Sequence, residues 1–226
     1  MSKVSKAVVV RGIGWLDGEA WGRVLRHERV VCGESAGAVP PWKQKDLFAY
    51  AIKNPGRFDA VSRMTLCACA LALKDAGATY QEGVKQDIGL VGTNASGCME
   101  ANVAYFQDYL AAGRILARGN LFVRTLSSSP MAEAAIHFGL CGPTLYIGFP
   151  GGGLDDLLDA GAGLVEDGGV ASVLAVRADE REAIAFLLGK ADGPGGVSWR
   201  AMSEMLVGAR GDTPVREWAS RLEKVM

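Results

Sequence analysis

The amino-acid sequence predicts an α/β protein with a mixed, mostly parallel sheet and helices on both faces of that sheet. Short β-rich apolar runs alternate along the 226-residue chain with longer segments whose apolar residues recur at helical spacing. Glycine-containing turns separate most of these segments. With 49% hydrophobic and 22% charged residues, the chain can bury a core and does not have the composition of a disordered sequence.

The N-terminal part is predicted to contain one strand and one short helix before an irregular connection. Residues 6–10 are β-rich and lead into Arg11-Gly-Ile-Gly14, a sequence typical of a turn after a strand. Residues 18–26 are interpreted as a short helix. Residues 32–57 carry glycine, proline and polar residues, which predicts an irregular connection.

Stronger signals follow up to residue 113. Asp59 suits the cap of a helix over residues 60–75, and Gly77 is placed to end that helix. The further elements predicted in this part are a strand over residues 87–91, a turn over residues 92–97, and a helix over residues 99–112 that ends at Gly113.

The second half alternates between helices and strands. Ser127, Ser128 and Ser129 offer capping oxygens ahead of Pro130, which suits the first turn of a helix. Residues 144–149 are continuously apolar, which indicates a strand buried on both faces. The other predicted elements are helices over residues 131–138, 154–166, 198–207 and 214–225, strands over residues 170–176 and 183–188, and a loop over residues 192–196.

Charge and hydropathy exclude several classes of partner. The formal net charge of −1 leaves no basic surface for nucleic acid or an anionic membrane. No apolar stretch approaches the roughly 20 residues that span a bilayer. The N-terminal apolar run is short and followed by glycines, which fits a strand better than a signal peptide. We therefore expect a cytoplasmic protein without a membrane span.

The cysteines, histidines and aspartates form no recognisable metal or catalytic pattern. The spacing of the cysteines matches neither a zinc site nor a thioredoxin motif, so reduced structural thiols are expected. His27 lies in a charged stretch and His137 near the end of a short helix. No metal and no cofactor are expected. The residues in question are Cys32, Cys67, Cys69, Cys98 and Cys141, together with Asp155, Asp156 and Asp159, which are interpreted as a solvated helix face.

A glycine turn ahead of residues 154–166 is the most suggestive candidate site. It consists of Phe149, Pro150, Gly151, Gly152 and Gly153. Free backbone N–H groups at the start of a helix can bind phosphate or an oxyanion. The Lys and Ser/Thr of a phosphate-binding loop are absent, however, and the aspartates that follow would repel phosphate. A tight strand-to-helix connection is the simpler interpretation. The Gly-x-Gly near the N-terminus likewise lacks the third glycine of a dinucleotide-binding motif.

Five segments in order resemble the N-terminal half of β-ketoacyl synthases, in the thiolase-like superfamily. They are AVVVRGIGW, SRMTLCACALALKDAG, DIGLVGTNASG, MAEAAIHFGLCGPTLYI and LLDAGAGLVEDGGVASVLAVRADE, and they extend over residues 6–180. The resemblance implies one half of the usual duplicated thiolase-like fold. It also implies a ketosynthase N-terminal-like domain over residues 1–190 and a C-terminal helical tail over residues 191–226 packed on the same domain.

The same resemblance argues against condensation chemistry. Counted from Gly142 and Pro143, the family's acylated cysteine falls on Gly151, which cannot form a thioester. Neither His27 nor His137 matches the two catalytic histidines, which lie in the family's C-terminal half. The chain is thus similar to chain-length factors, the non-catalytic partners of ketosynthases. The expected role is a non-catalytic accessory subunit in fatty-acid or polyketide-type biosynthesis.

An interface is also implied by the resemblance. In the family, the strand before the nucleophile pairs with its counterpart across a dimer, and a second segment reaches toward the partner's pocket. The matching residues are Asn120, Leu121, Phe122, Val123, Thr144, Leu145, Tyr146 and Ile147. The expected partner is a second copy or a ketosynthase, with an acyl carrier protein as a further candidate.

Two alternatives stay open. The chain could handle acyl thioesters, with the amides of the glycine turn as an oxyanion hole and Cys98 or Cys141 as a nucleophile, although Cys141 should lie at the far end of its strand. It could instead be a small-ligand or phosphate-binding module on the same fold. Half of the fold would leave an apolar face for a partner or for the tail to cover. The apolar tail residues are Trp199, Met202, Met205, Leu206, Val215, Trp218 and Leu222.

Overall fold

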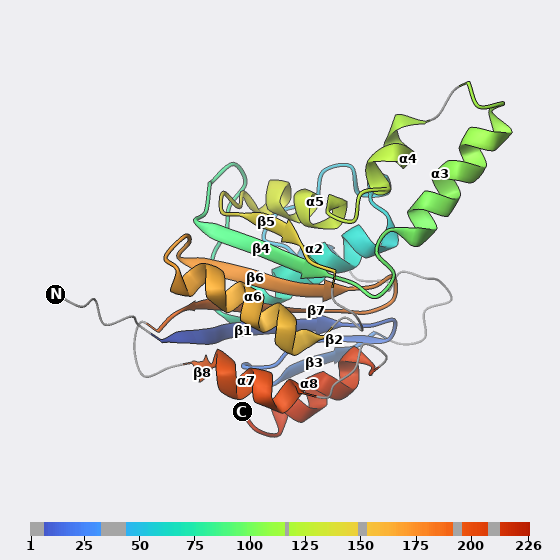
Figure 1. The fold of residues 1–226 in the computed structure, drawn as a ribbon. Helices are drawn as coiled ribbons and strands as arrows, with labels where there is room; N and C mark the ends of the chain where they lie inside the picture. Colours follow the sequence, from blue (N-terminus) through green and yellow to red (C-terminus); the bar gives the residue numbers. More distant parts are fainter. Residues whose placement is uncertain (1–6, 33–43, 116–117, 149–152, 192–195, 208–212) are drawn as a thin grey trace.

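The computed structural model describes residues 7–32, 44–115, 118–148, 153–191, 196–207 and 213–226. These residues form one eight-stranded sheet with helices on both faces (Figure 1). The strands are β1 (Val8–Leu16), β2 (Ala20–Arg23), β3 (Glu28–Val31), β4 (Ile88–Thr93), β5 (Thr144–Tyr146), β6 (Ser172–Ala178), β7 (Ala183–Lys190) and β8 (Val197–Ser198). The helices are α1 (Gln44–Leu47), η1 (Pro55–Arg57), α2 (Ala60–Asp75), α3 (Met99–Ala111), α4 (Gly119–Arg124), α5 (Ser129–Phe138), α6 (Leu154–Glu166), α7 (Trp199–Leu206) and α8 (Val215–Glu223).

The sheet is mixed, with the strand order β3-β2-β1-β7-β6-β4-β5 and β8 paired to β1. The prediction of a mixed sheet between two helical layers is confirmed. Among the described strands, however, parallel pairing is confined to β5-β4-β6 and every other strand pair is antiparallel. The expectation that most strand pairs would be parallel is therefore wrong. The reason is the connections: helices link β4, β5 and β6, whereas short turns link β1 to β2, β2 to β3 and β6 to β7.

The predicted turn at residues 11–14 is wrong, because β1 continues through it to Leu16. Its glycines serve close packing instead of a change of direction. A Cβ atom on Gly12 would lie 2.3 Å from the Ala72 carbonyl oxygen, and one on Gly14 would lie 2.4 Å from the Ala72 nitrogen. The two glycines therefore let α2 lie directly on the strand.

The predicted helix over residues 18–26 is also wrong, because this segment forms β2 and the turn after it. The Asp17 carboxylate accepts hydrogen bonds from the N–H groups of Glu19 and Ala20 and so turns the chain back along β1. The end of the hairpin is held from far away. The buried Asp75 carboxylate accepts from the N–H groups of Ile13, Leu25 and Arg26, a contact that local sequence does not reveal.

Helices α2 and α5 cover one face of the sheet. The predicted cap is confirmed, since the Asp59 side chain accepts a hydrogen bond from the Ser62 N–H at 2.7 Å. Gly77 follows the end of α2 with φ +68°, as expected for a helix-terminating glycine. The predicted serine cap of α5 is wrong: Ser128 is the N-cap residue but makes no capping hydrogen bond with its side chain. The Ser127 and Ser129 hydroxyls donate instead to the Cys98 sulfur and the Val123 carbonyl.

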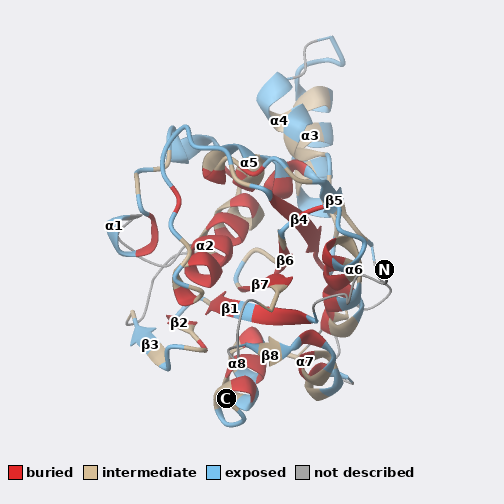
Figure 2. Cartoon of the chain, turned by 90° about the vertical axis from the view of Figure 1, so that its left-hand side faces the viewer, coloured by how far each residue is buried: buried red, intermediate tan, exposed pale blue. Residues whose placement is uncertain are grey.

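Helices α6, α7 and α8 cover the opposite face (Figure 2). The predicted helix over residues 154–166 coincides with α6, and residues 198–207 and 214–225 contain α7 and α8 as predicted. The two terminal helices insert apolar side chains into the same core cluster as α6 and the strands. These are Trp199, Met202, Leu206, Val215, Trp218, Ala219 and Leu222, with Met205 partly buried beside them. The tail therefore covers an apolar face of this sheet.

The strand predicted over residues 144–149 is shorter and less buried than expected. β5 spans Thr144–Tyr146 and, among the described residues, is the last strand of the sheet, with β4 on one side only. The side chains of Thr144 and Leu145 are exposed, and those of Tyr146 and Ile147 are half-buried. Its apolar character therefore reflects an uncovered sheet edge.

The remaining predicted elements are found close to their expected positions. The strands over residues 87–91, 170–176 and 183–188 correspond to β4, β6 and β7, and the helices over residues 99–112 and 131–138 to α3 and α5. Within residues 32–57, the described part contains the short helices α1 and η1. The predicted loop over residues 192–196 lies outside the described residues except for Gly196.

Helices α3 and α4 project from the body as a helical arm (Figure 1). Neither helix contains a buried residue. Within the arm, the Tyr105 ring packs against Phe122 at 5.6 Å between centroids, and Arg118 forms an ion pair with Asp108 at 2.7 Å. The arm thus holds itself together by a few contacts and leaves much of its apolar surface exposed. Among the described residues, no helix has both the length and the hydropathy to cross a membrane.

Candidate functional site

The candidate site lies at the carboxyl ends of the parallel strands β4 and β6. The chain leaves β4 through a turn that Asn94 closes with its own side chain. Its Oδ1 accepts from the Gly97 N–H at 2.6 Å, and its Nδ2 donates to the Gly97 carbonyl at 2.9 Å. Gly97 has φ +64°, a conformation that favours glycine. This turn delivers Cys98 to the start of α3.

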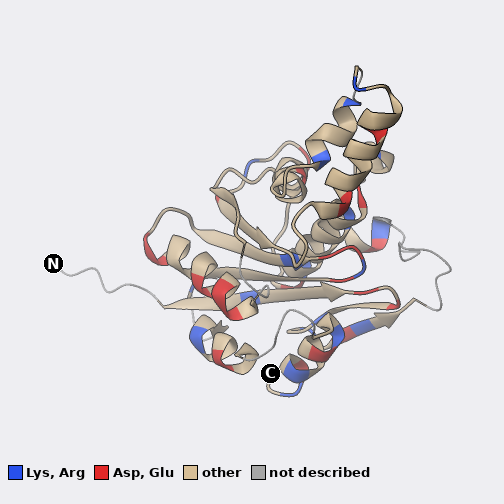
Figure 3. Ribbon diagram, turned by 45° about the vertical axis from the view of Figure 1, so that its right-hand side comes forward, with Lys and Arg blue, Asp and Glu red and all other residues tan. Residues whose placement is uncertain are grey.

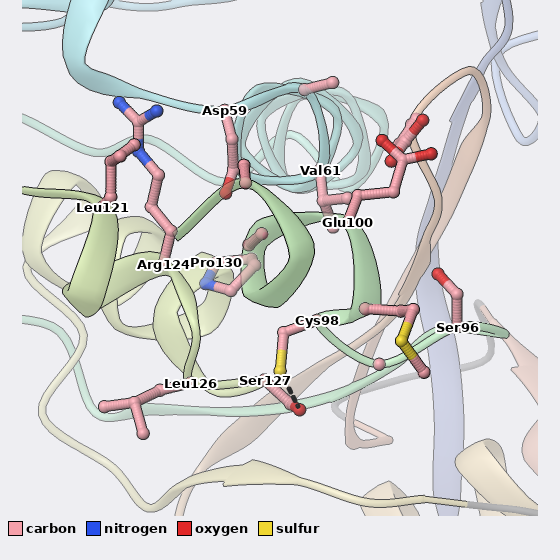
Figure 4. A pocket seen from close by; sticks show the side chains of 16 residues that line it. Asp59, Val61, Ser96, Cys98, Glu100, Leu121, Arg124, Leu126, Ser127 and Pro130 are labelled. Atoms are coloured by element: carbon pink, nitrogen blue, oxygen red, sulfur yellow. Dashed lines mark hydrogen bonds between the residues drawn. The ribbon is translucent and has the colours of Figure 1, made fainter. Parts of the chain in front are cut away.

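A cavity of about 350 Å³ lies between the base of the arm and the body of the protein (Figure 4). The N-terminus of α2, the start of α3, the α4–α5 connection and the β6–β7 turn each contribute to its wall. The apolar part of the wall includes Val61, Ala101, Ala104, Leu121, Leu126 and Pro130. The polar part includes Asp59, Ser96, Cys98, Glu100, Arg124, Ser127 and Glu180. The site is therefore an apolar pocket with polar groups on one side, the usual make-up of a small-molecule site.

Cys98 is the nucleophilic group in this wall. Its sulfur receives a hydrogen bond from Ser127 Oγ at 3.3 Å (Figure 4). It receives another from Asn102 Nδ2 at 3.0 Å. The thiol itself donates to the Thr125 carbonyl at 2.7 Å. These hydrogen bonds fix the position of the sulfur, and none of its partners in the described part of the chain is a general base.

A pair of carboxyl groups lines the cavity where the arm meets the body. Glu100 lies in the first turn of α3, and Glu180 lies in the turn between β6 and β7. The hydrogen bond between the two carboxyls raises the pKa of Glu180 to about 7, with burial as a further cause and Arg181 opposing both. Glu180 therefore keeps its proton to a higher pH than an ordinary glutamate, and its hydrogen bond to Glu100 links the body to the arm.

Through Glu180, which His137 opposes in part, the protein is expected to lose a contribution to its stability as the pH rises from about 4.5 to about 7. The ordinary pKa of Glu180 is 4.5, so within this window the folded protein binds a proton that the unfolded chain has lost. Glu180→Gln should flatten this part of the curve, which thermal unfolding against pH measures. The contribution of Glu180 to the slope of the unfolding free energy against pH stays below about 1.4 kcal/mol per pH unit, the value for one full proton, because solvent screens the pair. Glu204→Gln on α7 is the matched control, and an equal flattening there would contradict the assignment.

Most of the predicted glycine turn lies outside the described residues. Phe149, Pro150, Gly151 and Gly152 are in this group, and only Gly153 is described, as the residue that precedes α6. The aspartates after it are confirmed as a surface feature: Asp156 and Asp159 are exposed and Asp155 is half-buried. Within the described residues, no cluster of three or more His, Cys, Asp or Glu side chains could hold a metal ion.

The predicted interface residues occupy two separate elements. Asn120, Leu121, Phe122 and Val123 lie on α4, whereas Thr144, Leu145 and Tyr146 form β5 and Ile147 follows it. Both elements contact the candidate site. Leu121 lines the cavity, and the Tyr146 hydroxyl donates to Asn94 Oδ1 at 3.1 Å in the turn that leads to it. Phe122, Val123 and Leu145 are exposed apolar side chains.

The other cysteines and the histidines lie away from the cavity. Cys141 is exposed at the opposite end of β5, as expected. Burial raises the pKa of the Cys67 thiol to about 12 and that of Cys69 further still, so both remain protonated. His137 packs among the rings of Phe48, Tyr50 and Phe138, and burial lowers its pKa, while His27 is exposed. All five cysteines are free thiols.

Sequence reasoning missed most of the polar wall. Cys98 was a candidate only under the alternative of acyl transfer, and Glu100, Arg124 and Glu180 carried no motif. Their meeting depends on the β6–β7 turn lying beside α3, which no local pattern reports. The usable signal was the position of Asn94 and Cys98 directly after a buried strand, where sites of α/β proteins form.

Comparison with known proteins identifies the fold. Neither a protein-family profile nor a curated protein matches the chain. Among solved structures, the ishigamide ketosynthase/chain length factor superposes with a TM-score of 0.60 at 13% identity, over 84% of this chain and 59% of that one. The structure of a type II polyketide synthase acyl-carrier protein in complex with its ketosynthase bound to the hexaketide gives a TM-score of 0.57 at 12% identity. The match covers 83% of this chain and 59% of that one. A β-ketoacyl synthase from Burkholderia phymatum STM815 gives a TM-score of 0.54 at 14% identity, over 83% of this chain and 60% of that one.

These likenesses show that the chain has the fold of thiolase-like ketosynthases, as the resemblance implied. The chain spans about 60% of the length of each of these three structures.

Proposed function

We propose that this protein is a non-catalytic ketosynthase-like accessory subunit, similar to a chain-length factor, in polyketide or fatty-acid biosynthesis. The observation that carries the proposal is the ketosynthase fold with Gly151 at the position that the resemblance assigns to the acylated cysteine. Glycine has no side chain that could hold an acyl group as a thioester. The partners that follow from this role are a ketosynthase and an acyl carrier protein.

The edge of the sheet supports pairing with a partner chain. β5 is bonded to β4 on one side, and among the described residues no strand pairs with its other side. Such an edge is a template for another strand. The exposed apolar side chains of Leu145 on β5 and of Phe122 and Val123 on α4 extend the surface that a ketosynthase would cover.

Light scattering of the protein mixed with a ketosynthase and carrier protein from the same organism tests the proposal. A stable mixed complex is expected. Leu145→Glu should weaken it roughly tenfold or more, because a charge would replace an apolar contact at the pairing edge. Val31→Glu, an exposed apolar residue on β3 at the other edge of the sheet, is the matched control and should leave the complex intact. Absence of any mixed complex would refute the role.

The cavity favours one alternative, which a separate measurement distinguishes. Cys98 is a thiol in the wall of an apolar pocket and could accept an acyl group from a thioester. Intact mass after incubation with an acyl thioester should stay unchanged if the subunit is non-catalytic. A mass gain that is lost in Cys98→Ser, but retained in Cys141→Ser, would instead establish acyl transfer at the cavity.

A further inference from the structure

The carboxyl pair of Glu100 and Glu180 lies where the cavity between the arm and the body opens to solvent. Both residues line the cavity; Glu100 is exposed and Glu180 is half-buried. Figure 3 shows acidic residues at the base of the arm, where α3 begins. An ionised carboxylate only accepts hydrogen bonds, so the bond between the two groups requires the proton that Glu180 holds. The pair therefore contains one proton and one negative charge.

Two further charged residues flank Glu180 in the turn between β6 and β7. Asp179 forms an ion pair with Arg177 at 3.2 Å and accepts a hydrogen bond from the Ala95 N–H at 3.1 Å. Arg181 is exposed and lowers the pKa of Glu180 less than the hydrogen bond and burial raise it. This turn therefore supplies the carboxyl pair with no cation that takes the place of its proton.

The other charged groups of the cavity wall lie on α4 and at the start of α2. Arg124 donates a hydrogen bond to the Arg57 carbonyl, and Figure 4 shows Arg124 and Glu100 on opposite sides of the cavity. Arg124 is the one basic residue among the described residues of the wall, whereas Asp59 adds a third carboxyl to the pair. The cavity therefore disfavours an anionic ligand and favours a cation at the carboxyl pair.

The rest of the cavity has room for a small apolar body. Its volume of about 350 Å³ is at the lower end of the usual range for small-molecule sites. On α3, the wall residues that follow Glu100 are Ala101 and Ala104, whose side chains are short. Leu121 on α4 and Leu126 after it add apolar surface. A ligand that matches both parts has a short hydrocarbon chain and one positively charged end.

We propose that the cavity binds a small primary amine, with its ammonium group between the carboxylates of Glu100 and Glu180 and its hydrocarbon chain against the apolar wall. An ammonium group has three N–H donors and no acceptor, so it can donate to both carboxylates at once. It takes the place of the Glu180 proton, which leaves to solvent, and the net charge of the occupied pair is unchanged. The site uses neither Gly151 nor the β5 edge, so it can fail independently of the proposed function.

Isothermal titration calorimetry of the full chain with hexylamine tests the site at pH 6, below the pKa of Glu180 of about 7. Titrations in two buffers with different heats of ionisation measure the protons released, and a release of about one proton per bound amine is expected. Hexanol and hexanoate have the same chain without the positive charge, and each should bind at least about tenfold more weakly. Equal binding of hexanol, or amine binding without proton release, would overturn the assignment.

Two pairs of variants test the charge and the space separately. Glu180→Gln should weaken hexylamine binding about tenfold or more, whereas Glu204→Gln, at an exposed position on α7, should leave it unchanged. Leu121→Trp fills the cavity and should block the amine, whereas Val123→Trp, at an exposed position of the same helix, should not. Far-UV circular dichroism verifies that each variant is folded. Retained binding in Glu180→Gln or Leu121→Trp, or no binding to the unmodified chain at millimolar hexylamine, would refute the site.

Discussion

Gly14→Ala is expected to lower the free energy of unfolding by about 3 kcal/mol, since inserting a methyl group into a tight backbone contact costs 1–3 kcal/mol and sometimes more. The new Cβ atom would lie 2.4 Å from both the Ala72 nitrogen and the Leu71 Cβ. Backbone atoms within a hydrogen-bonded helix cannot move alone, so α2 would have to shift away from β1. Since α2 contributes much of one core cluster, the loss spreads over that face of the sheet.

Urea unfolding followed by circular dichroism measures this loss. Gly18→Ala is the matched control, because a Cβ atom at Gly18 meets no atom within 4 Å. Its effect should stay within about 0.5 kcal/mol, as for other surface changes. Equal stability of the two variants would mean that β1 and α2 are not in direct contact.

Trp218→Ala is expected to cost about 3–5 kcal/mol, the usual range for removing a buried aromatic side chain. Trp218 is fully buried in the cluster that joins α8 to the sheet. The Arg177 guanidinium also lies over its ring at 4.8 Å, and a desolvated contact of this kind adds up to about 2 kcal/mol. The tail would then stop contributing to the core.

Thermal or urea unfolding of Trp218→Ala and Trp218→Phe separates the effect of the lost side-chain volume from the effect of the lost ring contact with Arg177. Phe keeps a ring against Arg177 and removes an indole N–H that is buried without a hydrogen-bond partner among the described residues, so it should cost clearly less than Ala. Val225→Ala, an exposed apolar change near the same terminus, should be close to neutral. A neutral Trp218→Ala would show that α8 is not a structural part of the fold.

Local chemistry explains which elements could be predicted from the sequence. The helices over residues 60–75 and 154–166 carry their own caps or apolar periodicity, and both were found with little or no shift. β2 was predicted as a helix because its conformation depends on pairing with β1 and on the Asp75 carboxylate. The glycines of β1 were interpreted as a turn because their real neighbour, Ala72, is far away in the sequence.

The candidate site was less predictable than the fold, because tertiary packing, and not local sequence, brings most of its residues together. Cys98 follows a buried strand, and this position could be inferred. Glu180 became part of the wall only through the antiparallel turn between β6 and β7, whose position beside α3 is a tertiary feature. The exposure of Leu145 depends on β5 being the last strand, which its apolar sequence concealed.

The place of β1 in the sheet has a consequence for how the chain acquires its structure. β1 lies between β2, which follows it at once, and β7, which is made more than 160 residues later in the register Val8 to Lys190. During synthesis, the hairpin of β1 and β2 therefore leaves the ribosome with one long apolar edge unpaired until β7 emerges. Pairings of such sequence separation form slowly, and an open edge invites aggregation in the meantime. The nascent chain should accordingly depend on chaperones until β7 has been made.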